Sequence, residues 1–295
     1  MLAKALTVLA DEVIIDLEDS VAPAAKNDAT RRAAADALSR PGWRAETRSV
    51  RLNSLSSPWG ANDLEQIVRW AGASIHCLVI PKCESPADIQ TVSALLDGLE
   101  SDLGLKHRIG LEIQIEAARG RVAVEEIAAS SGRLEALIFG PGDFAASLGV
   151  LEPQLGGIDD RYPGDQWHYA RSRIAVAAHA FGLAAIDGPF SALHDLEGLL
   201  ESARRARLLG FVGKWVLHPG QVEPCNAVFS PSLEELERAR GILSALTESG
   251  STGRGAATLG GEMIDEASRR MAEALIASAE PASEALGTDR RGEDK

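Results

Sequence analysis

The sequence predicts an α/β fold in which parallel strands alternate with helices. Seven short apolar segments, most of them rich in Val, Ile and Leu, have the pattern of buried strands, and helical segments separate them. Such alternation is typical of parallel strands joined by right-handed crossovers. The chain has 295 residues, of which 45% are hydrophobic, so it is long enough for one large domain with a C-terminal appendage. Seven strands are one fewer than a (β/α)₈ barrel contains.

The first hundred residues give four helices separated by three strands. Apolar, β-branched runs mark the strands, and Ala- and Leu-rich runs mark the helices. Ser85-Pro86 is typical of a helix start, with a serine N-cap and a proline at the first helical position. In order, we expect a helix at 2–10, a strand at 13–17, a helix at 26–39, a strand at 48–52, a helix at 62–71, a strand at 76–80 and a helix at 85–99.

The remainder of the chain continues the same alternation. A Gly- and Asp-rich surface loop is expected at 150–164, and a Gly/Ser/Thr-rich linker at 248–261. The other predicted elements are strands at 111–115, 134–139 and 183–186, a last strand with its exit at 211–219, and helices at 121–131, 165–181, 196–209, 232–246 and 266–279.

Composition excludes several classes of function. The net charge of −13 argues against nucleic acid as the main partner. Residues 1–21 lack a basic region followed by a long apolar run, so they match neither a signal peptide nor a membrane span. The odd number of cysteines (Cys77, Cys83 and Cys225) and their spacing argue against a disulfide framework. We therefore expect a cytoplasmic protein with reduced thiols that binds neither nucleic acid nor membrane.

Two carboxylates follow consecutive strands of the central stretch. The strand at 111–115 ends on Glu116, and the strand at 134–139 runs into Gly140-Pro141-Gly142-Asp143. Neighbouring parallel strands lie about 5 Å apart, and ligands bind at their carboxyl ends. Either carboxylate alone is equally well explained as a cap of the following helix. The pair, with a glycine-rich lead-in that allows close approach to a ligand, favours a site for a hard cation such as Mg²⁺.

Other strands deliver further polar residues to the same edge. The acids after the first strand could form a solvated turn, and Arg51 could be a surface arginine. An arginine at this edge could instead bind a carboxylate through two parallel hydrogen bonds. The residues in question are Asp16, Glu18 and Asp19, then Arg51 and Asn53, then Lys82, and finally Asp187-Gly188-Pro189.

Four motifs resemble one known family. The sequence is similar to the citrate lyase β-subunit/malyl-CoA lyase family, within the HpcH/HpaI aldolase superfamily, over nearly its whole length. At Asp187-Gly188-Pro189-Phe190 it resembles the malyl-CoA lyase branch closely. The other matching segments are Gln114 to Gly120 (apolar-Ile-Glu-small-Ala-x-Gly), Gly140 to Gly149 (Gly-x-x-Asp-Phe-Ala-Ala-Ser-x-Gly) and Val50 to Asn53 (Val-Arg-x-Asn).

The resemblance implies a TIM (β/α)₈ barrel with a C-terminal helical lid. The family begins one strand earlier than this sequence, so we expect an N-terminally truncated barrel at 1–247 whose first strand is missing. The linker at 248–261 would lead to a lid helix at 262–280 and a disordered tail at 281–295. In malyl-CoA-lyase-like proteins the lid covers the active site of an adjacent subunit, which implies a homotrimer or hexamer.

The resemblance also assigns roles to the polar residues. Glu116 and Asp143 would hold Mg²⁺, or Mn²⁺ in its place, with Asp16, Glu18 and Asp19 nearby. The acid/base group would be Asp265 on the lid, a position that equally suits an N-cap of the last helix. Arg51 would bind the α-keto acid and take part in catalysis. The remaining substrate-binding residues would be Asn53, Lys82 and the loop of Asp187, Gly188 and Pro189.

The activity implied is reversible, Claisen-type cleavage of a CoA thioester. The substrate would be (S)-malyl-CoA, β-methylmalyl-CoA or citramalyl-CoA, and the products an acyl-CoA and glyoxylate or pyruvate. Three alternatives stay open: thioester hydrolysis giving malyl-CoA thioesterase or malate-synthase-like activity, a CoA-independent pyruvate aldolase, and a citrate lyase β-type subunit that works with an acyl carrier protein.

Overall fold

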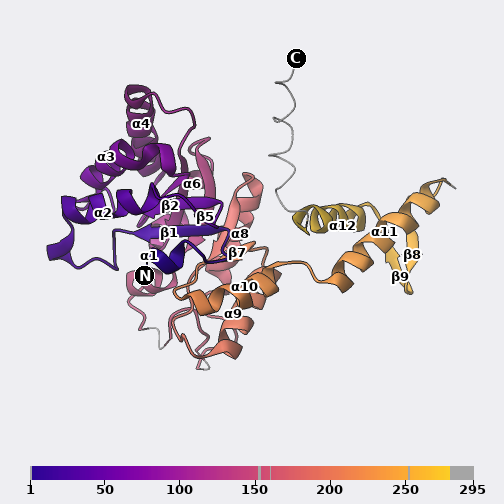
Figure 1. Cartoon of the computed structure of the whole chain (residues 1–295). Coiled ribbons are helices and arrows are strands. Elements are labelled where there is room, and N and C mark those ends of the chain that lie inside the picture. Colours follow the sequence, from indigo (N-terminus) through magenta and orange to yellow (C-terminus); the bar gives the residue numbers. More distant parts are fainter. Residues whose placement is uncertain (1, 152–153, 160, 252, 280–295) are drawn as a thin grey trace, which may run out of the picture. The chain divides into compact units, whose positions relative to one another are not determined.

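The computed structural model of the chain describes residues 2–151, 154–159, 161–251 and 253–279 (Figure 1). Within these residues, seven parallel strands form one sheet in the order in which they occur in the sequence. The predicted alternation of parallel strands and helices is therefore confirmed. The strands are β1 (Glu12–Asp16), β2 (Thr47–Arg51), β3 (Cys77–Ile80), β4 (Gly110–Ile115), β5 (Leu134–Phe139), β6 (Ala184–Asp187) and β7 (Gly213–Lys214).

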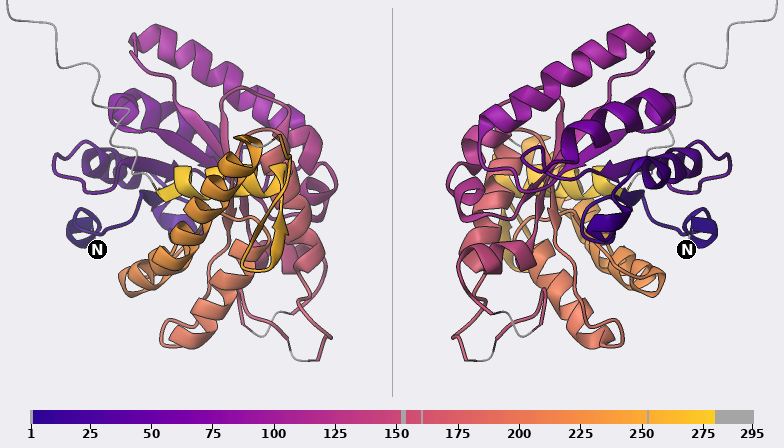
Figure 2. Two further views of the ribbon diagram at one scale, coloured as in Figure 1. Left: turned by 90° about the vertical axis from the view of Figure 1, so that its right-hand side faces the viewer. Right: turned by 90° about the vertical axis from the view of Figure 1, so that its left-hand side faces the viewer.

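Helices surround the sheet, as the two side views show (Figure 2). The α8 helix packs against β5 and β6, and α2 packs against α3. The helices of this part of the chain are α1 (Leu2–Ala5), α2 (Asp28–Leu38), α3 (Gly60–Ala71), α4 (Pro86–Leu103), α5 (Ala118–Val122), α6 (Val124–Ala128), α7 (Pro141–Ser147), α8 (His168–Ala180), α9 (Leu196–Leu208) and α10 (Val222–Phe229).

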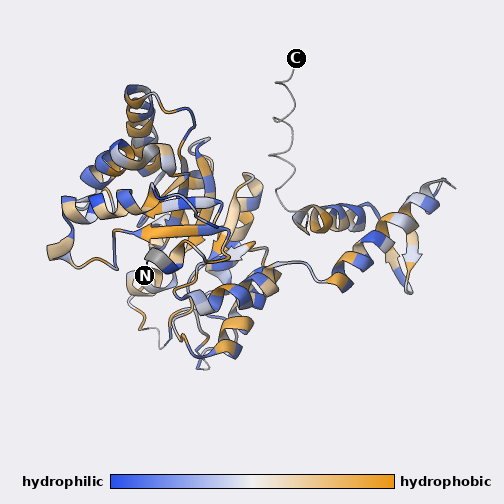
Figure 3. Ribbon diagram, in the orientation of Figure 1, coloured by the Kyte–Doolittle hydropathy of each residue, from blue (hydrophilic) through white to orange (hydrophobic). Residues whose placement is uncertain are grey.

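Strand β4 shows how the sheet separates apolar from polar side chains. All six of its residues are buried. Because successive side chains point to opposite faces, Leu111 and Ile113 lie on one face, and Glu112 and Gln114 on the other. The hydropathy colouring shows apolar strands beside mixed helix surfaces (Figure 3). One face of β4 thus contributes to the apolar core, while the other carries buried polar groups toward its end at Glu116.

Side chains connect chain segments near the two ends of the sheet, although the contacts are not made by β1 or β7 themselves. The Asn226 amide donates to the Leu9 carbonyl at 2.8 Å, and the Arg51 guanidinium lies 5.3 Å from the centre of the Trp215 ring. Among the described residues, β1 and β7 nevertheless do not pair with each other. The sheet is a partial, curled barrel, and the missing first strand stays a prediction.

Local differences from the predicted elements have identifiable causes. The segment after β5, expected to be a glycine-rich loop, forms helix α7, because Pro141 at its first position has a suitable φ and lacks only an N–H that would be unpaired there. The helix expected at 121–131 is divided into α5 and α6 at Ala123, whose φ of −93° and ψ of 13° depart from helical values.

The chain divides into two compact units, Met1–Ala227 and Val228–Lys295, whose boundary lies inside α10, and the domain bounds expected from the sequence stay a prediction. In the second unit α11 (Leu233–Ser251) packs against α12 (Glu266–Ala279). Strands β8 (Ala257–Leu259) and β9 (Glu262–Ile264) form an antiparallel hairpin. Both residues of its turn, Gly260 and Gly261, have positive φ, as a tight two-residue turn requires.

Within the described part of the 248–261 segment, α11 continues to Ser251 and β8 covers Ala257–Leu259, where the composition suggested a flexible linker. The expected tail at 281–295 lies outside the described residues, and the lid function of the helix stays a prediction. None of the described helices is long and apolar enough to cross a membrane.

Candidate active site

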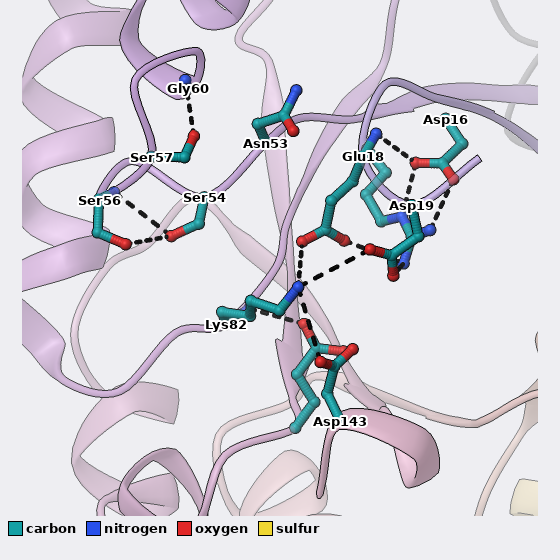
Figure 4. Close-up of polar contacts among 12 residues, drawn as sticks. Asp16, Glu18, Asp19, Asn53, Ser54, Ser56, Ser57, Gly60, Lys82 and Asp143 are labelled. Carbon is teal, nitrogen blue, oxygen red and sulfur yellow. Dashed lines mark hydrogen bonds and ion pairs between the residues drawn. The ribbon is translucent and has the colours of Figure 1, made fainter. Parts of the chain in front are cut away.

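Charged residues from the ends of consecutive strands meet beside one pocket (Figure 4). The pocket has a volume of about 470 Å³, and Lys82, Glu116 and Asp143 line it. Glu116 directly follows β4, and Asp143 lies in the first turn of α7. The predicted convergence of Glu116 and Asp143 at the carboxyl edge of the sheet is thus what the structure shows.

Arg51 holds the acids that follow β1. Its Nε and Nη2 atoms lie 2.8 and 2.6 Å from the two Asp16 carboxylate oxygens, and its Nη1 atom lies 3.2 Å from Glu18. Burial alone would raise the pKa of Asp16, but the hydrogen bonds and charge of Arg51 lower it. Because Asp16 already accepts both bonds from this edge of the guanidinium, the same edge is not available to bind a substrate carboxylate.

Lys82 connects the acids of β1 with the two predicted metal ligands. Its Nζ atom is 2.7 Å from Glu18, 3.9 Å from Asp19 and 3.7 Å from Asp143. Figure 4 shows the ammonium group between these carboxylates. Burial would lower the pKa of Lys82, but the hydrogen bond to Glu18 and the surrounding carboxylates raise it to about 12. The side chain is therefore a permanent positive charge in the site.

The backbone of Lys82 is as informative as its side chain. Its φ of 53° is unusual for a residue with a side chain and marks a locally strained conformation. In this conformation the Lys82 N–H donates a hydrogen bond of 2.8 Å to Oε1 of Glu116. Lys82 thus orients Glu116 through its backbone N–H and balances the negative charge of Glu18 through its side chain.

Glu116 is the most strongly perturbed group at the pocket. Only 3% of it is exposed, and burial, together with the charges of Asp143 and Glu18, raises its pKa to about 8. A Cβ atom on Gly140 would lie 2.4 Å from Oε2 of Glu116, so a larger residue at 140 would displace this carboxylate. The glycine before α7 accommodates Glu116 itself, whereas the sequence suggested that it accommodates a ligand.

These carboxylates fit a hard divalent cation. A buried carboxylate beside two others is disfavoured in its charged form, and a bound cation would reverse that effect. Within the described ranges, no three His, Cys, Asp or Glu side chains form a ready metal cage. A cation held by Glu116 and Asp143 would therefore keep water or substrate oxygens as further ligands, as Mg²⁺ does.

Asn53 is directed into the protein and does not line the pocket. It is 3% exposed, and its Nδ2 group donates to the Leu17 carbonyl at 2.8 Å and to Asp63 at 2.6 Å. Its Oδ1 atom accepts a hydrogen bond from Lys26 at 2.5 Å. The geometry supports a positioning role for Asn53, which holds the backbone at Leu17, where the sequence suggested substrate contact.

Asp187 is also removed from any pocket surface. It is 0% exposed, Lys214 donates a hydrogen bond to its Oδ2 atom, and its Oδ1 atom lies 3.1 Å from Nε of Arg171. The expected substrate contact through this side chain is therefore not supported. Neither Gly188 nor Pro189 lines the described pocket. Asp187 and Lys214 are paired residues in the β6–β7 register, so strand alignment could have identified the partner.

Asp265 caps the last helix. Its Oδ1 atom accepts hydrogen bonds from the backbone N–H groups of Ala267 and Ser268, at 3.0 and 3.2 Å. The capping role considered from the sequence is confirmed. The catalytic role stays a prediction, since Asp265 belongs to the second unit.

Further polar residues, which were not predicted from the sequence, line the wall of the pocket. A run of serines directly after β2 was the available signal, and the hydroxyls of Ser54 and Ser56 are 2.9 Å apart. Asp88 has a structural role, since it accepts hydrogen bonds from the backbone N–H groups of Glu84 and Ser85. The polar residues of this wall are Ser54, Ser56, Glu84, Asp88 and Ser147.

Comparison with known proteins gives concordant similarities. The HpcH/HpaI aldolase/citrate lyase family model matches residues 1–219. The L-malyl-CoA/beta-methylmalyl-CoA lyase of Rhodobacter capsulatus is 40% identical over 282 residues, which cover 92% of this chain and 88% of that protein. A (3S)-malyl-CoA thioesterase of Cereibacter sphaeroides is 34% identical over 281 residues, covering 95% of this chain and 90% of that protein.

Among solved structures, CitE from Mycobacterium tuberculosis in complex with magnesium, acetoacetate and coenzyme A superimposes with a TM-score of 0.76. It is 32% identical to this chain, and the match covers 94% of this chain and 92% of CitE.

Proposed function

The chain belongs to the HpcH/HpaI aldolase/citrate lyase family, and we propose that it is a Mg²⁺-dependent lyase acting on a CoA thioester. Its substrate would be malyl-CoA or a close 3-hydroxyacyl-CoA, such as β-methylmalyl-CoA or citramalyl-CoA. Cleavage of one carbon–carbon bond would release an acyl-CoA and glyoxylate or pyruvate. The names of the relatives support the substrate class, and the magnesium and coenzyme A in CitE support the cofactor and the thioester.

The observation that carries this proposal is the buried carboxylate Glu116 beside Asp143 at an open pocket. These two residues would hold Mg²⁺, which when bound supplies Lewis-acid polarisation of the oxo-acid oxygens. Mn²⁺ offers the same oxygen-ligand chemistry. The ends of two neighbouring strands are enough to bring both carboxylates to the pocket, so no large rearrangement is needed to assemble the pair.

The charge balance of the site explains why a cation is needed. Two cationic side chains, Arg51 and Lys82, interact with the five carboxylates of Asp16, Glu18, Asp19, Glu116 and Asp143. Arg51 is already paired with Asp16 and Glu18, so it holds the acids in place more than it attracts an anion. An oxo-acid anion would be repelled by such a site without a divalent cation. Lys82, which lines the pocket, is the protein group placed to contact the anion.

Proton transfer at the acyl carbon needs a further acid/base group besides Glu116, Asp143 and Lys82. We assign it to Asp265, as the family resemblance implies, acting from the lid of a neighbouring subunit in a homotrimer or hexamer. Closure of the lid would exclude the water that could quench an enolate or hydrolyse the thioester.

A coupled assay tests the proposal. Purified protein would be given (S)-malyl-CoA with Mg²⁺ or with EDTA, glyoxylate would be trapped as its phenylhydrazone, and free CoA would be followed with a thiol reagent. We expect Mg²⁺-dependent glyoxylate without free CoA. A folded protein that releases neither glyoxylate from malyl-CoA or β-methylmalyl-CoA nor pyruvate from citramalyl-CoA would contradict the proposal.

Thioester hydrolysis is the second candidate, because one relative over 95% of the chain is a (3S)-malyl-CoA thioesterase. The same assay separates the two activities. Free CoA without glyoxylate would establish hydrolysis in place of carbon–carbon cleavage.

A further inference from the structure

We propose that the buried ion network of Asp187, Lys214 and Arg171 is a positioning device for Asp143. The network is in contact with the turn between β5 and α7, which delivers Asp143 to the pocket. The inference deepens the proposed function and rests on it, since it concerns a residue proposed to hold the metal.

The network is built from side chains that water does not reach. The side chains of Asp187, Lys214 and Arg171 are each 0% exposed. Arg171 also lies 2.9 Å from Asp165, and Lys214 donates to the Ser202 hydroxyl at 3.1 Å. Two cations are thus balanced by two carboxylates inside the protein. Although burial acts to raise the pKa of Asp187, the charges of Arg171 and Lys214 lower it.

The first link to Asp143 runs through an aromatic ring. The Arg171 guanidinium lies 5.5 Å from the centre of the Phe139 ring, and Phe139 is the last residue of β5. The Phe139 and Phe144 rings meet edge to face at 5.7 Å. Phe144 is the residue directly after Asp143, so the guanidinium and the two rings hold both ends of the turn that carries the carboxylate.

The second link runs through the backbone after Asp187. A Cβ atom on Gly188 would lie 2.3 Å from Cδ of Pro141 and 2.4 Å from the Phe139 carbonyl oxygen. The chain at Gly188 therefore rests directly on the same turn, and only a glycine fits there. Since Asp187 is fixed by two cations, the position of Gly188 is fixed with it.

Removing the Asp187 charge should act on Asp143 for a physical reason. Asp187→Asn would remove the carboxylate that Arg171 and Lys214 share and would leave these two buried cations near each other, which is costly in a protein interior. Repulsion would move Arg171 or Lys214, and the movement would reach Phe139 and Pro141. Disturbing groups that orient a metal ligand typically weakens metal affinity about 10- to 100-fold.

A second buried arginine offers a matched control. The Arg133 side chain is 0% exposed and pairs with Glu100 through two hydrogen bonds of 2.7 Å. It lies just before β5, at the opposite end of the sheet from the pocket. Glu100→Gln removes a partner carboxylate from a buried arginine, as Asp187→Asn does, without a link to the turn.

The experiment compares Asp187→Asn and Glu100→Gln with the unchanged protein. Titration calorimetry without substrate would measure Mg²⁺ binding. Thermal unfolding in EDTA would measure stability, and the coupled assay would give kcat and KM. We expect both variants to melt earlier, and only Asp187→Asn to lose about tenfold or more in Mg²⁺ affinity, with a lower kcat. A folded Asp187→Asn protein with unchanged Mg²⁺ affinity overturns the inference.

Two further variants keep the test decisive. If Asp187→Asn does not fold, Gly188→Ala pushes on Pro141 without changing any charge, and unchanged Mg²⁺ affinity in it overturns the inference. Asp143→Asn separates this inference from the proposed function. If Asp143→Asn loses Mg²⁺ binding while the folded Asp187→Asn and Gly188→Ala proteins keep it, the positioning role alone fails. Full Mg²⁺ affinity in Asp143→Asn removes the metal assignment and, with it, the positioning role.

Discussion

Glu112 and Glu116 lie on the same face of the same chain segment, four residues apart, yet their surroundings differ. Glu112 is 5% exposed and Glu116 is 3% exposed, and burial raises the pKa of both, with neighbouring carboxylates adding to the effect. Glu116 opens onto the pocket and accepts a hydrogen bond from the Lys82 N–H. A buried acid with a raised pKa is therefore not by itself a sign of catalysis.

Acids predominate in the surroundings of Glu112. It lies beside Glu12 of β1, Glu135 of β5 and the thiol of Cys77 on β3. Cys77 donates to Glu135 at 3.2 Å, and Oε2 of Glu112 has no hydrogen-bond partner among the described residues. We infer that burial and the neighbouring acids favour the protonated form of Glu112, whereas Glu116 is placed to lose its proton when a cation binds.

The largest expected difference is in activity. Glu116→Gln should lower kcat on the order of a thousandfold and abolish Mg²⁺ binding, because the variant lacks one of two metal-binding carboxylates. Glu112→Gln makes the same chemical change on the same strand and should keep both properties. The coupled assay and calorimetry measure them, and equal losses in the two variants would show that the pocket does not distinguish these acids.

Removing the positive charge of Lys82 should have a smaller effect on activity. Lys82→Met should lower kcat/KM about 10- to 100-fold, because Glu18 and Asp143 lose their nearby positive charge. Since the pKa of Lys82 is raised to about 12, its contribution should stay constant up to about pH 10. The exposed Lys106→Met is the control, and steady-state kinetics of both variants would settle whether the charge at residue 82 matters.

The dependence of the free energy of unfolding on pH should report the proton that the folded state keeps on Glu112. Its pKa is raised on folding, so the folded state keeps a proton that the unfolded state releases above about pH 4.5. The free energy of unfolding therefore falls as pH rises from there through the folded-state pKa. Glu112→Gln does not titrate, so it should match the unchanged protein near pH 4.5 and exceed it by about 1–2 kcal/mol at pH 8.

Urea unfolding in EDTA at both pH values measures this difference, with the change at Glu116 common to both proteins. A stability difference that does not vary with pH would exclude titration of Glu112 as its cause.

The smallest effect concerns the coupling of Glu12 with Glu112. Glu12 is less buried, and burial is also the first cause that raises its pKa. Glu12→Gln alone should stabilise the protein at pH 8 by less than Glu112→Gln does. The double variant should gain less than the sum, by about 0.5 kcal/mol or more, because the two acids titrate as a pair. Strict additivity in a double-mutant cycle would mean that they are independent.

The pattern of apolar residues along the chain was enough to predict the strands and the edge of the sheet at which polar residues gather. The period of apolar residues locates β4 and β5, and the rule that consecutive parallel strands are neighbours brings Glu116 and Asp143 together. The consecutive glycines Gly260 and Gly261 were also a local signal for a tight turn. The polar residues around them suggested a linker in its place. These features depend on residues close in sequence, so a single chain is enough to predict them.

Contacts between distant parts of the chain set which polar residues face the pocket and which are buried and support other residues. Asn53, Arg51 and Asp187 all follow or end strands in the same way, yet their partners come from distant segments. Lys82 reaches Glu18 across 64 positions, and Lys214 reaches Asp187 across 27. Whether a side chain at a strand end binds a ligand or another side chain depends on strand register and helix packing. Both are set by the burial of apolar surface over the whole fold, which no local pattern encodes.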